Sequence, residues 1–329
     1  MNFRIEDLAR PSGWAQLDTV RLVLSSVVVI SHANYVFTTP LGYVALFPFI
    51  QWCAWLAVLA FFVLSGLVIG RALNRKRDGF FAFMVRRVGR IYPPLIASFV
   101  LVIALDVWLR FADISTHAPS NAGPLVHGFS YDLRRALACL ATLGFRGRLD
   151  SDSNAALWSL AIEMRCYVAA GLFAQMIFAR SIFIKVLSAA ALLYVLMYAL
   201  NKLLLHDLLD HRTALSYLAF GCGIALSLFL KRIPSIIPAV RVDISYSLFI
   251  FHFPIMMAVF FVFYQPEFSS IWQALYLSIF SIMVSVTLSL ASALSIEKLR
   301  FKSNFGSFRA LKAAFQRPAG TPEAADPRN

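Results

Sequence analysis

Long apolar stretches without charged residues dominate the chain, and they predict helices that cross a membrane. Residues 22–70 contain no Asp, Glu, Lys or Arg, and Pro40, Gly42 and Pro48 interrupt them. Because about 20 residues cross a hydrocarbon core, this stretch is long enough for two crossings. Further apolar runs lie at 91–105, 157–179, 182–200, 213–230, 244–264 and 269–296. We expect an all-α fold, a polytopic transmembrane helix bundle of about eight spans.

The composition points to the same class of protein. Apolar residues make up 60% of the 329 residues and charged residues 14%, whereas a soluble domain has about 25% charged residues. The four cysteines form no closely spaced pair, so they indicate neither a disulfide framework nor a zinc site. Mixed polar residues precede the first apolar run without a small-residue cleavage site, so we expect no cleavable signal peptide.

The net charge of +13 predicts an orientation in the membrane rather than a nucleic-acid partner. With the N-terminus in the cytoplasm, 22 of the 30 Lys and Arg residues fall in inside segments and 7 in outside segments. This asymmetry follows the positive-inside rule, so we expect both termini in the cytoplasm. Residues 1–302 are predicted to form the membrane-embedded domain. Residues 303–329, which end in a Pro-, Gly- and charge-rich stretch, are predicted to be a disordered tail.

Few ionisable residues fall inside predicted spans, where charged groups are costly and often functional, and three of them are His32, Glu163 and His252. His32 lies 11 residues after Arg21, and His252 lies 11 residues after Arg241. At 1.5 Å per residue this is ~16 Å, so both imidazoles are expected near the membrane midplane. Glu163 enters its span from the opposite side. We predict that the three side chains converge on one buried, water-accessible cavity.

Simpler interpretations remain open for each residue. A single buried histidine can be a neutral member of the bundle, hydrogen-bonded to a neighbour. Arg21 and Arg241 can be interface residues that extend to the headgroups. Glu163 can serve only to neutralise Arg165, although residues two apart on a helix do not face each other.

Arg86, Arg87 and Arg90 form a second cluster, directly before Pro93 and Pro94. Since proline suits the first turn of a helix, we expect the arginines on a short surface segment that precedes a new span. Guanidinium groups bind phosphate bidentately, although an inside-positive loop in contact with anionic lipid explains the cluster equally well.

Two further segments have simpler assignments. The small residues that end the stretch 61–66 are typical of helix packing. Residues 132–145 are expected to form a short amphipathic or re-entrant helix.

Six segments together resemble the acyltransferase-3 family of bacterial inner-membrane O-acyltransferases. The first is Leu17-Asp18-Thr-Val-Arg21 followed by Ser31-His32, with ten residues between Arg and His. The others, in chain order, are Phe61–Gly66, Arg87–Pro93, Trp158–Glu163 with Tyr167, Ile244–Pro254 and Glu297. Each motif is degenerate alone, but their order along the chain makes the resemblance specific.

The resemblance implies transfer of an acyl group, usually acetyl, from cytoplasmic acyl-CoA to a hydroxyl of a cell-envelope or secreted glycan. Implied catalytic residues are His32 as general base or transient acyl carrier, Glu163 as an orienting or acceptor-binding group, and His252 as a group that polarises the acyl carbonyl. Arg21, Arg86, Arg87 and Arg90 would hold the phosphates of CoA. Acyl-CoA is then a substrate, and no permanently bound cofactor or metal is expected. The expected partners are acyl-CoA, a glycan or lipid-linked glycan, and membrane lipids, in a bacterial inner membrane.

The sequence also departs from the family pattern. Only 88 residues separate Glu163 from His252, where members generally have more chain and about ten spans, so a helix pair is missing. Arg165 stands where the family tends to be neutral. No appended extracytoplasmic domain is expected, which leaves room for a separate partner of that kind or for a homo-oligomer. The alternative function is a transporter or flippase of a glycan or lipid intermediate. The sequence shows no inverted repeat of the kind typical of such proteins.

Overall fold

The computed structural model describes residues 16–42, 47–76, 79–117, 126, 128–146, 149–205, 211–230, 244–263 and 270–316. Over these residues the chain is mainly helical, which confirms the predicted all-α bundle. The helices are α1 (Gln16–Thr38), α2 (Phe47–Lys76), α3 (Phe80–Phe111), α4 (Leu133–Ala141), α5 (Trp158–Phe178), α6 (Ile182–Leu205), α7 (His211–Phe229), α8 (Ser245–Phe263) and α9 (Ile271–Gln316). Short 3-10 turns lie at Thr39–Leu41 (η2) and Ala155–Leu157 (η3).

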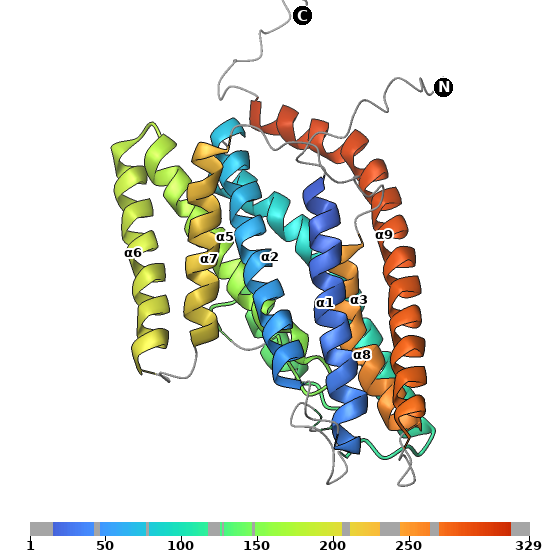
Figure 1. The fold of residues 1–329 in the computed structure, drawn as a ribbon. Helices are drawn as coiled ribbons and strands as arrows, with labels where there is room; N and C mark the ends of the chain where they lie inside the picture. The colour runs from blue at the N-terminus through green and yellow to red at the C-terminus, as the bar shows by residue number, and fades with distance from the viewer. Residues whose placement is uncertain are drawn as a thin grey trace, which may run out of the picture.

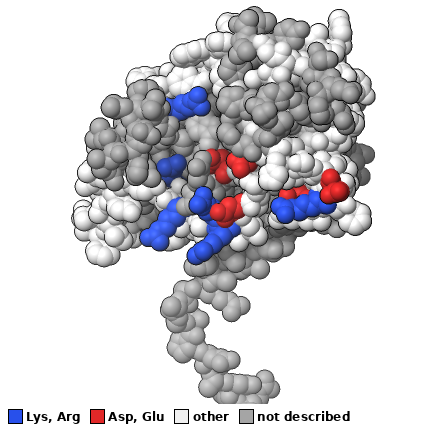
Figure 2. Space-filling view, turned by 90° about the horizontal axis from the view of Figure 1, so that it is seen from below, with Lys and Arg blue, Asp and Glu red and all other residues white. Residues whose placement is uncertain are grey.

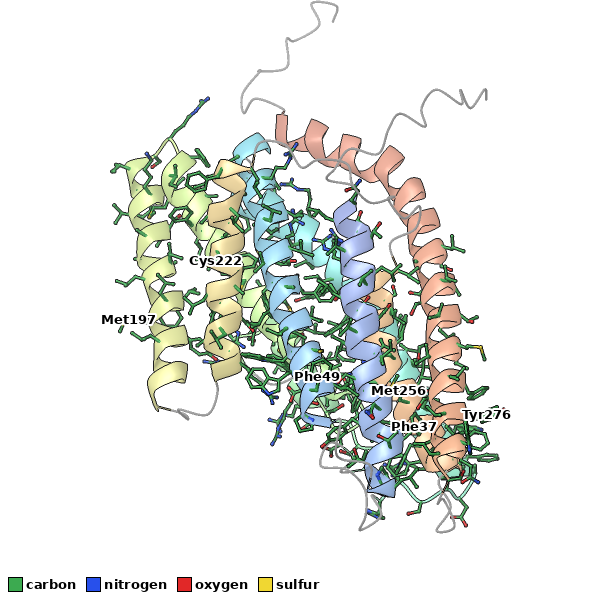
Figure 3. The ribbon with its side chains drawn as sticks, viewed as in Figure 1. Phe37, Phe49, Met197, Cys222, Met256 and Tyr276 are labelled. Carbon is green, nitrogen blue, oxygen red and sulfur yellow. The ribbon has the colours of Figure 1, made fainter. Side chains whose placement is uncertain are left out.

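The chain is a multi-pass membrane protein. Within the described ranges, seven helices are long and apolar enough to cross a bilayer, namely α1, α2, α3, α5, α7, α8 and α9. The remaining predicted span, 182–200, lies in α6 and is also helical. Its apolar part, Ile182–Tyr198, is shorter than those of the other seven helices. Many apolar side chains point outward, among them Met197 on α6 and Tyr276 on α9 (Figure 3). Such a surface suits lipid rather than water.

The helices run roughly side by side, and the two ends of the bundle differ (Figure 1). α1 begins at the end where α9 finishes, and the last turns of α9 bend across that end (Figure 1). The segment between α3 and α5, which includes α4, lies at the opposite end (Figure 1). The orientation of these ends relative to the cytoplasm stays a prediction.

α8 is the most deeply buried span. Its side chains from Ile250 to Phe261 are all buried, and α1, α3 and α9 pack around it. Phe37 of α1 and Phe260 of α8 have ring centroids 6.4 Å apart. A helix that is apolar on all sides belongs in the centre of a bundle, so the residues of α8 meet protein rather than lipid.

Glycines bring α2 and α7 into close contact. A Cβ atom on Gly66 would lie 2.1 Å from the carbonyl oxygen of Phe220, and one on Gly223 would lie 2.1 Å from that of Val63. Only glycine allows backbones to approach this closely. The interpretation of Gly66 as a packing residue is therefore correct.

The short helix predicted at 132–145 is present as α4. Asp132 caps it, since its side chain accepts a hydrogen bond from the backbone N–H of Arg135 (3.0 Å). This is the usual way in which an aspartate satisfies an unpaired N–H in the first turn of a helix.

The expected helix start at Pro93 and Pro94 is wrong, because both prolines lie inside α3. An interior proline removes a backbone hydrogen bond and crowds the carbonyl four residues earlier. For Pro93 that residue is Gly89, which has open space beside it. Membrane helices tolerate such interruptions, so the arginine cluster lies on the first turns of a long span.

The tail expected to be disordered from residue 303 is helical as far as Gln316. Phe301, Phe305, Phe308, Leu311 and Phe315 recur at intervals of three or four residues. This spacing gives one apolar face to a helix. The rest of the predicted tail, 317–329, lies outside the described residues.

We expect Gly223→Ala to lower the stability of the protein by about 1–3 kcal/mol, because overpacking forces two helices apart. Gly221→Ala is the matched control two residues away, where a Cβ meets nothing within 4 Å. Thermal unfolding in lipid nanodiscs compares the two. Equal melting temperatures for Gly223→Ala and the wild type would contradict the close α2–α7 contact.

Candidate active site

Two histidines from distant parts of the chain meet in the centre of the bundle. The Nδ1 atom of His32 in α1 lies 2.8 Å from the Nε2 atom of His252 in α8. His252 is fully buried, whereas His32 keeps a partly accessible surface. The expectation that the two imidazoles reach the same depth is therefore correct.

The hydrogen bonds determine which ring nitrogens carry protons. The Nδ1 atom of His252 lies 3.0 Å from the carbonyl oxygen of Leu248, and a carbonyl can only accept. His252 therefore carries its proton on Nδ1 and accepts at Nε2. In the neutral pair, His32 must then donate from Nδ1, which leaves a lone pair on its Nε2. This nitrogen is the free base of the pair.

The backbone around His252 is held by residues from two other segments. Pro254 has no N–H, so the carbonyl of Ile250 lacks its helical partner. Ser98 Oγ of α3 donates to this oxygen (3.2 Å), and Asn154 Nδ2 donates to it as well (3.0 Å). These bonds tie α8 to α3 and to the turn that precedes α5.

A cavity of about 80 Å³ lies between the helices, and we name it the arginine cavity. Two guanidinium groups, those of Arg21 and Arg90, are among its lining residues. One carboxylate, that of Glu163, also lines it. The remainder of the lining is aromatic, aliphatic or hydroxyl-bearing: Val58, Phe61, Phe62, Ser65, Ile91, Ser159, Leu160, Tyr167, Ser245, Tyr246 and Phe249. It is an apolar pocket with a few fixed polar groups, as is usual for small-molecule sites.

Glu163 belongs to a hydroxyl cluster in this cavity rather than to the histidine pair. Its Oε1 atom accepts a hydrogen bond from Ser65 Oγ (2.9 Å) and another from Tyr167 OH. Ser65 and Tyr167 also lie 3.0 Å apart. Residues 163 and 167 are four apart and share a helix face. The prediction that Glu163, His32 and His252 share one cavity is not met, because Glu163 lines the arginine cavity and neither histidine is among its lining residues.

An aromatic pair separates the histidines from the arginine cavity. The Phe61 and Phe249 rings, which both line the cavity, have centroids 6.0 Å apart. Phe249 is also 6.0 Å from the ring of His252. The histidine pair and the cavity are therefore neighbours across one layer of rings.

The side chains of the four predicted phosphate-binding arginines do not all line the same cavity. Arg21 and Arg90 reach the cavity, and Arg21 also pairs with Asp18 at 3.1 Å. Arg87 instead packs over the rings of Phe83 and Tyr167, with its Cζ atom 5.3 and 5.8 Å from their centroids. Arg86 is not among the lining residues. Arg241 and the side chain of Glu297 lie outside the described residues.

The buried cysteine of α4 is unsuited to nucleophilic chemistry. Cys139 of α4 is buried, and burial, with a smaller contribution from Asp150, raises the pKa of its thiol to about 11. At neutral pH the thiol is protonated, and only a thiolate is strongly nucleophilic.

Comparison with known proteins assigns the family. Residues 14–233 match the acyltransferase-3 family, described as an acyltransferase domain. The chain belongs to this family. The chain is also 30% identical over 161 residues to an O-acetyl transferase of Shigella phage Sf6. That alignment covers 47% of this chain and 44% of the relative, so the match extends over less than half of the relative's length. No solved structure matches the chain significantly.

The match confirms the resemblance that the motifs suggested, and it places the chain among the acyltransferases. The matched region contains His32, Glu163 and the arginine cluster but ends before α8. His252 lies outside the matched region, and its contact with His32 at 2.8 Å links it to the matched residues.

Sequence reasoning missed two contributors to this region. Ser65 looked like a packing residue because it precedes Gly66, yet its hydroxyl bonds to Glu163. Asn154 stood in a polar loop without any motif. Its only signal was Pro254, since an interior proline implies that some donor must satisfy the carbonyl four residues earlier.

We expect Glu163→Gln to unfold at the wild-type temperature and Glu163→Leu to unfold lower. Gln keeps an oxygen that accepts from Ser65 and Tyr167, whereas Leu removes this acceptor and leaves the two hydroxyls only each other as partners. One of the two then lacks an acceptor, at a cost of about 1–3 kcal/mol for a buried group. Thermal unfolding of the two variants in nanodiscs measures this. A Glu163→Gln protein as unstable as Glu163→Leu would show that the carboxylate charge, and not its hydrogen bonds, maintains the cluster.

Proposed function

We propose that the protein is an O-acetyltransferase of a bacterial inner membrane. It moves an acetyl group from cytoplasmic acetyl-CoA to a hydroxyl of a cell-envelope or secreted glycan. The observation that carries the proposal is the hydrogen-bonded pair of His32 and His252 at the centre of a chain of the acyltransferase-3 family. The phage relative, named an O-acetyl transferase, supports the acetyl group as the one transferred.

His32 serves as the base through its Nε2 atom. The carbonyl of Leu248 fixes the tautomer of His252, and His252 in turn fixes that of His32. An imidazole suits this role because it exchanges a proton near neutral pH when unperturbed. His252 is then a positioning residue, which holds the orientation of His32 and stabilises the imidazolium that forms. This replaces the expected role of His252 as a group that polarises the acyl carbonyl.

The arginine cavity receives the donor. Arg21 and Arg90 attract the phosphates of CoA, and the apolar walls suit the uncharged arm that carries the thioester. Arg87 supports this site indirectly, since its guanidinium packs on Tyr167. The thioester carbon approaches His32 past the rings of Phe61 and Phe249.

The reaction balances with these groups alone. The acceptor hydroxyl gives its proton to Nε2 of His32, and its oxygen attacks the thioester carbon. The C–S bond breaks as the new C–O bond forms, and the proton passes from His32 to the leaving thiolate of CoA. Attack by Nε2 itself, which forms a transient acetyl-histidine, uses the same lone pair.

His32→Ala removes this lone pair, and we expect it to abolish acetyl transfer while the protein remains folded.

His252→Gln should lower kcat about 100-fold or more with little change in the KM for acetyl-CoA, because it disturbs only the orientation of the base. Transfer of labelled acetyl from acetyl-CoA to extracted envelope glycan measures both. The control is His117→Ala, at an exposed histidine outside the bundle. Wild-type transfer by His32→Ala would remove His32 from the mechanism.

Arg90→Ala should raise the KM for acetyl-CoA about tenfold, because it deletes a charge-assisted contact to phosphate. Arg86→Ala changes the same charge four residues away, but Arg86 does not line the cavity. We expect it to have a much smaller effect. Steady-state kinetics with varied acetyl-CoA compare the two variants. Equal effects of the two variants would favour a contact with anionic lipid over a donor site.

A further inference from the structure

A second and larger cavity lies at the opposite end of the bundle, in the segment between α3 and α5. Its volume is about 400 Å³, and we name it the acidic cavity. It is lined by three carboxylates, one guanidinium and two large aromatic side chains, together with smaller residues: Ser130, Tyr131, Asp132, Arg135, Leu149, Asp150, Ser151, Asp152, Ala155 and Trp158. Seen from this end, Asp and Glu side chains gather near the middle of the face, with Lys and Arg beside them (Figure 2).

The charges of the acidic cavity oppose an anionic ligand. Asp132 pairs with Arg135 at 3.2 Å, and Asp152 accepts a hydrogen bond from Ser130 Oγ at 2.6 Å. Three carboxylates and one guanidinium leave an excess of negative charge, which opposes an anionic ligand. Carboxylate oxygens accept strong hydrogen bonds from hydroxyl groups. A ligand rich in hydroxyls and without negative charge fits this lining.

The aromatic residues add a second recognition element. Trp158 and Tyr131 both line the cavity, and the Tyr131 ring also packs against Phe99, with centroids 5.4 Å apart. The hydroxyl oxygen of Tyr131 is buried, and none of the described residues provides a hydrogen-bond partner for it. It is therefore a polar group that no protein contact in the described structure uses. Ring faces beside carboxylates and hydroxyls match a sugar, which has apolar C–H faces and polar hydroxyl edges.

The acidic cavity adjoins the arginine cavity along one helix. Trp158, the first residue of α5, lines the acidic cavity, and Ser159 and Leu160 directly after it line the arginine cavity. Glu163 follows one turn later on the same face as Ser159. A ligand in the acidic cavity thus lies one helical turn from the groups assigned to the donor.

We propose that the acidic cavity binds a neutral sugar of the acceptor glycan and presents one of its hydroxyls to the centre of the bundle. This inference rests on the proposed function. It assigns the two substrates to adjoining cavities, with the donor phosphates at Arg21 and Arg90 and the acceptor sugar in the acidic cavity. The charge of the lining disfavours a glycan of uronic acids or other anionic sugars.

Direct binding tests the inference without relying on catalysis. The full chain, in nanodiscs prepared without sugar detergents, is titrated with maltotriose and with trigalacturonate, a trisaccharide of similar size that carries three carboxylates. Saturation-transfer NMR gives the Kd of each. We expect millimolar or tighter binding of maltotriose and weaker binding of trigalacturonate.

Three variants locate the site. Trp158→Ala and Asp152→Asn should each raise the Kd of maltotriose about tenfold. Asp152→Asn keeps an oxygen that accepts from Ser130, so folding is preserved. Asp113→Asn is the matched control, an exposed residue outside the cavity with φ of 55°, a conformation that Asn also tolerates. We expect no change in its Kd.

The outcomes separate this inference from the proposed function. Absence of maltotriose binding, preference for trigalacturonate, or unchanged binding in Trp158→Ala and Asp152→Asn would overturn the acceptor site. Transfer of labelled acetyl from acetyl-CoA is measured on the same samples. If the wild type transfers no acetyl but binds maltotriose at this site, the proposed reaction fails while the sugar site stands.

Discussion

The carbonyl oxygen of Ile250 needs a hydrogen-bond donor that its own helix cannot supply, and the centre of the bundle is arranged around that need. In lipid an unpaired backbone group costs several kcal/mol, with no water to satisfy it. Pro254 lacks the N–H that would donate to this oxygen. Ser98 of α3 and Asn154 of the turn before α5 donate to it instead. The same contacts fix the position of α8 along its own axis relative to α3 and to the turn before α5. Since His252 lies two residues from Ile250, they also determine whether it can reach His32.

This arrangement separates three chemical tasks along the membrane normal. Guanidinium groups gather at one end of the bundle, a neutral pair of imidazoles lies in the middle, and carboxylates gather at the other end. Most fixed charges of the described residues stay near the ends, where headgroups and water screen them, and Glu163 and Arg165 are exceptions inside α5. The two hydroxyl donors to Glu163, and the guanidiniums of Arg21 and Arg90 in the same cavity, compensate its charge. The cost of burying ions thus shapes which groups occupy the interior.

The sequence predicted what depends on distance along a helix and missed what depends on neighbours in space. Charge-free stretches located the spans, and equal spacing from Arg21 and Arg241 put His32 and His252 at one depth. Spacing gives depth but not rotation about the helix axis. Glu163 therefore met Ser65 and Tyr167 instead of the histidines. The double proline failed as a helix start because both prolines lie inside α3, and interior prolines are tolerated in membrane helices, where other groups satisfy the freed carbonyls. Asn154 was invisible because the carbonyl that it satisfies lies about a hundred residues away.

The choice of His252, rather than a carboxylate, as the partner of His32 follows from the same constraint. In soluble enzymes an aspartate commonly orients the catalytic histidine and stabilises its charged form. At the buried position of His252 such an anion would need its own compensation throughout the resting state. A neutral imidazole anchored on the carbonyl of Leu248 fixes the tautomer without any resting charge. It stabilises the imidazolium less than a carboxylate would, because it offers a dipole instead of a full charge. In the reaction proposed above, the protonated state of His32 is then short-lived, as is required of a base that returns its proton to the leaving thiolate in the same turnover.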